Sequence, residues 1–188
     1  MERGPAYAVE GVEAGLPVAT ARGWRAAGAL RAGEAIVTLG GLAVLRGVAR
    51  SCLGAGMEPA FWPLALPAGA LGNAVGMILP ADQRIALGLD GGVMLLPARA
   101  LEHWRGAGRV APDGRAVVRL WFDRPQVVVA AGLHFASGGT GPDSGEAGAG
   151  AGAGPLSPGV PEAREIMALR IALDAGRGLA QAALAKRR

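Results

Sequence analysis

Short apolar runs separated by turn residues dominate the first 137 residues of the chain. Six of these runs have the length of β-strands rather than of helices. They are residues 35–39, 61–66, 84–89, 93–96, 116–122 and 126–130. Only 97–104 and, less regularly, 25–32 follow a helical pattern, and both are short. Because strands and helices do not alternate, the pattern predicts an all-β fold with short helical turns, and not a doubly wound nucleotide-binding fold.

Glycine and proline mark the turns between these runs. Turn signals lie at residues 40–41, 90–92, 112–114 and 123–125. The glycine pairs suit two-residue hairpin loops, which need a positive φ. The four tryptophans are half of the aromatic residues, and a domain of this size uses such residues mainly as core anchors. They are Trp24, Trp62, Trp104 and Trp121.

A change in composition near Ser137 divides the chain. Residues 138–159 consist almost entirely of Gly, Ala, Ser and Pro and cannot bury enough apolar surface to offset their ordering entropy, so they are predicted to form a flexible linker. The predicted organisation is an N-terminal extension (1–10), a β domain (11–137), the linker, and an amphipathic C-terminal helix (160–188). The apolar stripe of that helix contains Ile166, Leu169, Leu173, Ala180 and Leu184. Such a helix either docks on its own domain, frays, or binds a partner at the end of its tether.

Charge and composition exclude several function classes. A net charge of +4 over 188 residues is mild and favours solubility over nucleic-acid binding. No signal peptide is visible, and no apolar run approaches the ~20 residues that span a bilayer. The expected location is therefore cytoplasmic, although export without a signal would leave no mark in the sequence. With one cysteine and two histidines, neither a metal nor another cofactor is expected.

The inventory of reactive side chains gives no evidence for an ordinary enzyme. No serine lies in a G-x-S-x-G motif, and no paired carboxylates, H-E-x-x-H motif or Walker motif occurs. Cys52 follows Arg50 but has no histidine near it in sequence, which favours a buried or incidental thiol. His103 and His134 are interpreted as structural or surface residues.

Read together, the motifs of the body resemble a known family. Residues 15–48 resemble the opening of Hedgehog/intein-type (Hint) domains. The motif residues there are Gly15, Val18 to Thr20, Gly23-Trp24, Ala29-Leu30 and Gly33-Glu34. Residues 61–87 and 94–110 are similar to short bacterial Hint-domain proteins, and their segments 61–73 and 96–106 carry the most specific motifs. Residues 119–133 look like the final strand pair of that group.

The resemblance implies a β-rich disc or horseshoe with pseudo-twofold character that attacks the peptide bond at its own N-terminus. Three parts are needed for that chemistry. A Cys or Ser at the first position supplies the nucleophile, a downstream histidine donates a proton to the scissile amide nitrogen, and in splicing members a terminal Asn cyclises.

Carried over residue by residue, each part is missing. The nucleophile position falls near Gly11, and the histidine position falls at Gln83, which cannot transfer a proton at neutral pH. The only asparagine, Asn73, lies in the middle of the domain. Pro125 and Gln126 occupy the place where a His-Glu pair often stands. We therefore expect no catalytic, cofactor-binding or metal-binding residues.

The sequence thus predicts a Hint-fold protein with a degenerate autoprocessing site, acting as a structural or binding module for an unidentified protein partner. One alternative is residual autoprocessing, with Cys52 or Thr20 in a displaced role. Another is an adaptor that presents its C-terminal helix to a partner.

Overall fold

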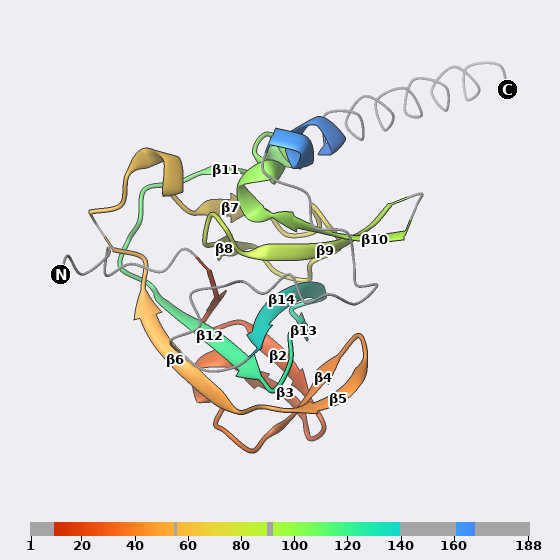
Figure 1. Ribbon diagram of the computed structural model, residues 1–188. Helices are drawn as coiled ribbons and strands as arrows, with labels where there is room; N and C mark the ends of the chain where they lie inside the picture. Colours follow the sequence, from red (N-terminus) through yellow and green to blue (C-terminus); the bar gives the residue numbers. More distant parts are fainter. Residues whose placement is uncertain (1–9, 55, 90–91, 140–160, 168–188) are drawn as a thin grey trace, which may run out of the picture.

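The computed structural model describes residues 10–54, 56–89, 92–139 and 161–167, and these form a β-rich body (Figure 1). The strands are β1 (Val12–Glu13), β2 (Pro17–Thr20), β3 (Gly23–Ala26), β4 (Ala35–Thr38), β5 (Gly41–Val44), β6 (Gly47–Cys52), β7 (Leu64–Leu66), β8 (Met77–Leu79), β9 (Arg84–Leu89), β10 (Gly92–Pro97), β11 (Gly108–Arg109), β12 (Ala116–Phe122), β13 (Gln126–Ala130) and β14 (Leu133–Gly139). Short 3-10 helices are Ala27–Ala29, Pro59–Phe61, Ala98–Leu101 and Trp104–Gly106. A helix covers residues 161–167.

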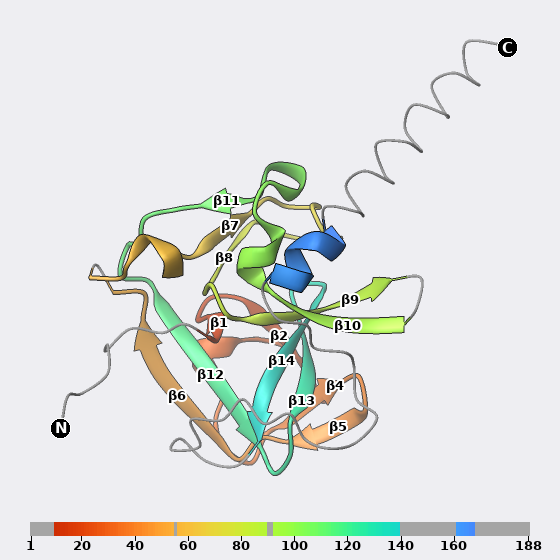
Figure 2. The ribbon, with the colours of Figure 1, turned by 45° about the horizontal axis from the view of Figure 1, so that its top comes forward.

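One large curved sheet runs through most of the body. Its strands follow the order β1-β12-β14-β13-β2-β4-β5, with β6 on β12, β3 on β2, and the β9–β10 hairpin on β14. A small sheet, β11-β7-β8, lies beside it (Figure 2). Nearly all neighbours are antiparallel, but β12 and β14 are parallel where Trp121 lies opposite Gly138. The sheet bends around the main core, and a second small cluster of Leu53, Met57 and Val117 lies apart from it.

The core is built by alternation along the strands. In β2, Val18 and Thr20 are buried, and in β4 so are Ile36 and Thr38, because successive side chains point to opposite faces. Phe122, Phe135, Ile85, Leu96 and Leu101 are among the largest fully buried side chains. Burial of such side chains is the main favourable contribution to folding.

The two segments with the most specific motifs pack on each other. Buried Asn73 accepts a hydrogen bond from Leu71 N (3.1 Å) and donates to the carbonyls of Pro67 and Val75 (2.8 Å each). The Trp104 indole N–H donates to the carbonyl of Ala70 at 3.2 Å. Asn73 and Trp104 thus hold the loop at residues 67–75 in one conformation. This role explains the small residues that surround Asn73 in the sequence motif.

Most of the predicted strands are confirmed. The runs at 84–89, 116–122 and 126–130 are strands over the whole of their predicted lengths, and the run at 35–39 is a strand to Thr38. The run at 61–66 is a strand only from Leu64, because Pro59–Phe61 turns the chain into a 3-10 helix.

Two predictions were wrong in the first part of the body. Residues 25–32 are not one helix, since Arg25 and Ala26 end strand β3 and only Ala27–Ala29 turns. Trp24 is not a core anchor, because β3 pairs on one side only and leaves the indole 60% exposed. Trp104 is buried as predicted, and Trp62 and Trp121 are half-buried.

The described start of the C-terminal helix docks on the body. Ala163 and Met167 are buried in the main core, and Arg164 forms a 3.7 Å ion pair with Glu102. Ile166, from the predicted apolar stripe, is half-buried. The rest of that stripe and nearly all of the predicted linker lie outside the described residues. Within those residues, none of the helices has the length and apolarity needed to cross a membrane.

Candidate functional site

The two positions carried over from the resemblance are in direct contact. The Gly11 backbone N–H donates a buried hydrogen bond to Gln83 Oε1 at 2.8 Å, although the residues are 72 apart in sequence. The side-chain amide of Gln83 then donates to the carbonyls of Arg84 (2.8 Å) and Ala136 (2.9 Å). Gln83 therefore ties the entry to β1, the start of β9 and the middle of β14 together.

The turn before β9 fixes Gln83 in this position. Its own N–H donates to the Pro80 carbonyl at 3.1 Å, and its carbonyl accepts from Ala98 N at 2.8 Å. The side chain is only 4% exposed. A buried amide with its acceptor and both donors bonded is a satisfied structural group, which costs little free energy to bury.

The backbone at Gly11 accepts only glycine. Its φ is +128°, and a Cβ atom there would lie 2.9 Å from the Val118 carbonyl oxygen. A side chain at this position would therefore be strained by its own backbone and would also collide with β12. In this conformation no Cys or Ser nucleophile fits at position 11.

A small pocket of about 20 Å³ adjoins the Gly11–Gln83 contact. Its polar groups include Glu10, Arg119 and Ser137, which sequence reasoning did not single out for this place. Arg119 forms a 3.7 Å ion pair with Glu10, and the Ser137 hydroxyl donates to the Gln126 carbonyl at 3.2 Å. The pocket admits roughly one water-sized group and no larger ligand.

Neither histidine adjoins this pocket. His134 lies on β14 opposite Val129, and because it precedes buried Phe135 its side chain points to the other face of the strand. His103 is exposed, with a left-handed backbone (φ 72°), and begins the Trp104–Gly106 turn. Neither imidazole can exchange a proton with the Gly11 amide in this arrangement.

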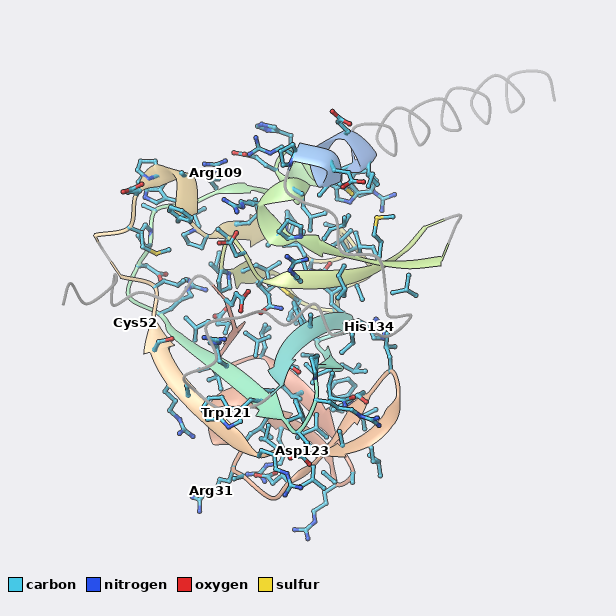
Figure 3. The ribbon with its side chains drawn as sticks, in the orientation of Figure 1. Arg31, Cys52, Arg109, Trp121, Asp123 and His134 are labelled. Carbon is cyan, nitrogen blue, oxygen red and sulfur yellow. The ribbon has the colours of Figure 1, made fainter. Side chains whose placement is uncertain are left out.

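Cys52 lies outside the site as well. It ends β6 opposite Ala116, whereas Val12 lies opposite Val118 on the other side of β12. Cys52 and Gly11 are separated by two strand spacings, from β6 across β12 to β1, and by three residues along the strand direction. This separation corresponds to about 14 Å. The thiol is exposed, so of the two interpretations given above, buried or incidental, burial was wrong. Figure 3 shows Cys52 and His134 on opposite sides of the body.

Thr20, the other displaced candidate, stabilises a turn. Its hydroxyl donates to the Gly23 carbonyl at 2.6 Å and accepts from Arg22 N. Thr38 makes the same bond to the Gly41 carbonyl, at 2.8 Å, in the β4–β5 hairpin. Two hairpins with the same Thr-x-x-Gly closure indicate a structural role for both hydroxyls.

Charged residues next to the site hold β1 in place. Glu13 forms a 2.9 Å ion pair with Arg115 and accepts a hydrogen bond from Ile78 N. Arg115 also binds Asp113, which accepts from its guanidinium at 2.6–3.0 Å. This hydrogen bonding lowers the pKa of Asp113 to about 2. The strand that follows Gly11, β1, is therefore held by the ion pair of Glu13 with Arg115 and by the hydrogen bond from Ile78 N.

The remaining residues considered from the sequence are not at the pocket. Asn73 stabilises the 67–75 loop, and Gln126 accepts a 3.2 Å hydrogen bond from the Thr38 hydroxyl. Within the described ranges, no three His, Cys, Asp or Glu side chains lie together as metal ligands.

Comparison with known proteins gives one family. The sequence matches the Hint domain family over residues 12–141. Solved structures with similar folds include the MchDnaB-1 intein (12% identical, covering 69% of this chain and 99% of that one, TM-score 0.45) and the gp41-1 intein (9%, 66% and 96%, TM-score 0.41). No curated protein matches the chain. The match covers more than half of the chain, and the chain belongs to the Hint domain family.

Proposed function

We propose that this Hint domain no longer cleaves its own chain and serves as a structural or binding module. The observation that carries the proposal is the hydrogen bond from Gly11 N–H to Gln83 Oε1. It joins the two positions at which the resemblance expects a nucleophile and a proton donor, and neither residue has that chemistry.

The chemistry of the Gln83 side chain supports the proposal, because its amide has no proton that it can transfer at neutral pH. For the amide nitrogen at the cleavage point to leave, a neighbouring group must donate a proton to it. Here the amide is the donor and Gln83 is the acceptor, while the Gln83 NH₂ group is directed to two other carbonyls. A histidine at position 83 could donate a proton to the Gly11 nitrogen and so assist cleavage. The glutamine at this position instead accepts a hydrogen bond from Gly11 and holds the backbone in place.

The two alternatives gain less support. Residual processing through Cys52 or Thr20 would need the thiol to move about 14 Å, or the Thr20 hydroxyl to leave its turn. For the adaptor, the described part of the C-terminal helix directs Ala163 and Met167 into the body, which favours docking on its own domain.

The intact mass of the protein tests the proposal. The purified chain is incubated for days with a strong thiol nucleophile, with an active Hint domain treated in parallel as a positive control. We expect an unchanged full-length mass. Loss of the N-terminal residues, or a thiol adduct at the start of the body, would contradict the proposal. If Cys52→Ala abolished that cleavage, residual processing through the displaced thiol would be established instead.

A further inference from the structure

Four neighbouring strands expose an apolar face on the outside of the body. Because Thr20 of β2 and Ile36 of β4 lie opposite each other and are buried, the residues next to them, Ala19 and Val37, point outward. The flanking strands β3 and β5 continue this outer face on either side.

The most exposed apolar side chains of the body lie on this face. Trp24 on β3 pairs with Ala19, and Leu42 on β5 pairs with Val37. Trp24 is 60% exposed, Leu42 66% and Val44, two residues along β5, 47%. Leu39, in the β4–β5 turn, is 51% exposed. These four residues, called the apolar face here, extend over three strand spacings, about 15 Å.

Arginines gather at one end of the same strands. Arg22 lies in the β2–β3 turn, Arg31 before β4, Arg46 after β5, and Arg124 in the β12–β13 turn. Between residues 14 and 57 the sequence has five arginines and one acidic residue, Glu34.

Of the arginines at this basic end, Arg46 is paired with a carboxylate, whereas Arg22 and Arg31 are not, within the described residues. Glu34 is paired with Arg25, and Asp123 with Arg46. Arg22 and Arg31 form no ion pair within the part of the chain that the structure describes. Figure 3 shows Arg31 at the lower margin of the body, pointing into solvent.

We propose that the apolar face and the basic end together dock on an anionic lipid surface. Tryptophan and leucine partition into the boundary between headgroups and acyl chains, and nearby arginines bind lipid phosphates. This goes beyond the proposed function, since it names a partner that does not depend on whether the chain cleaves itself.

The composition of the face favours lipid over nucleic acid. Single-stranded nucleic acid is bound by several aromatic rings on which successive bases stack. The apolar face has one ring, and its other members are aliphatic. Aliphatic side chains gain free energy by insertion among acyl chains, whereas they give a base no stacking partner.

The proposed orientation leaves the docked helix away from the lipid. In both ribbon views the β9–β10 hairpin lies between the helix at residues 161–167 and the strands β4 and β5 (Figures 1 and 2). The apolar face and the basic end therefore lie together, away from the helix. Substitutions on the helix serve as controls in the lipid-binding experiments.

Vesicle flotation tests the proposal with the full-length protein. We expect binding to phosphatidylcholine vesicles that contain phosphatidylglycerol, weaker binding to phosphatidylcholine alone, and loss of binding as salt is raised. The double variant Trp24→Ser/Leu42→Ser should bind about tenfold more weakly or worse. Its matched control is Val93→Ser on β10, which is 44% exposed on a different hairpin.

A second pair of variants tests the charge independently. Arg22→Glu/Arg31→Glu should also weaken binding about tenfold or more, whereas Arg164→Glu on the helix should leave it nearly unchanged. Thermal unfolding of each variant shows whether it is folded. Because the two pairs act through different physical terms, both must lower binding for the proposal to hold.

Three results would overturn it. The first is no binding to anionic vesicles at low salt. The second is binding that neither pair of variants weakens, which would place the contact elsewhere on the chain. The third is a vesicle-independent dimer, or tight oligonucleotide binding, that Trp24→Ser/Leu42→Ser removes, because the face would then serve a second copy or a nucleic acid.

Discussion

Single residues decide the character of the Gly11–Gln83 site. The resemblance assigned both positions from the sequence, but their contact was not predictable, because a separation of 72 residues carries no local signal. The pocket residues Glu10, Arg119 and Ser137 were missed for the same reason. They meet only when β1, β12 and β14 are assembled.

Gln83→Ala should destabilise the fold by about 1–3 kcal/mol, because it leaves the buried Gly11 N–H and two carbonyls without partners. Urea unfolding followed by tryptophan fluorescence measures this difference. Gln126→Ala is the control, as its half-buried side chain accepts a single 3.2 Å hydrogen bond from a side chain and should cost less. Equal effects of the two changes would argue against a special role for Gln83.

Gly47→Ala should cost about 1–3 kcal/mol, the usual range for overpacking. A Cβ atom on Gly47 would lie 2.0 Å from Trp121 Nε1, so the indole must leave its place against β6. Gly88→Ala on β9 is the matched control, since a Cβ atom there meets nothing within 4 Å. Thermal unfolding of both variants checks the prediction, which fails if Gly47→Ala is as stable as Gly88→Ala.

At the scale of the elements, strands with continuous apolar runs were predictable and mixed strands were not. The strands β9, β12 and β13 read as Val/Leu/Ile-rich runs, and two of them bury residues on both faces: Ile85 and Ala86 in β9, Val117 and Val118 in β12. By contrast, β3 (GWRA) and β6 (GVARSC) each begin with a glycine and carry an exposed arginine, so their pattern does not indicate a strand. Pairing with a neighbour creates these strands, and pairing is not a property of the local sequence.

The turn at Asp113 predicts how stability depends on pH. Because the Arg115 guanidinium lowers the folded pKa of Asp113 to about 2 from an ordinary 3.8, the ion pair stabilises the fold fully above about pH 4. That contribution disappears as the pH falls towards 2. Asp113→Asn should therefore flatten the acid limb of a plot of Tm against pH and leave the limb above pH 5 parallel to that of the parent. An unchanged acid limb would exclude this ion pair as a contributor.

For the whole molecule, the docked helix extends the core beyond the sheet. Met167 is 3% exposed and belongs to the same core cluster as the strands. Met167→Ala should lower the free energy of unfolding by about 2 kcal/mol or more, the usual range for a buried methionine, and should speed proteolysis near residues 161–167. Glu165→Ala, which changes an exposed side chain on the same helix, should do neither. If the two variants are cleaved at the same rate, the helix contributes nothing to the core.

The backbone of Gly11 has a consequence for how this chain can change over time. A single codon change to cysteine would place a side chain where φ is +128° and β12 leaves no space, so a nucleophile at this position is itself destabilising. A change of Gln83 to histidine alone would remove the acceptor that holds the Gly11 amide. Neither step is favourable before the other, so the fold itself opposes the appearance of a Cys–His pair at these two positions.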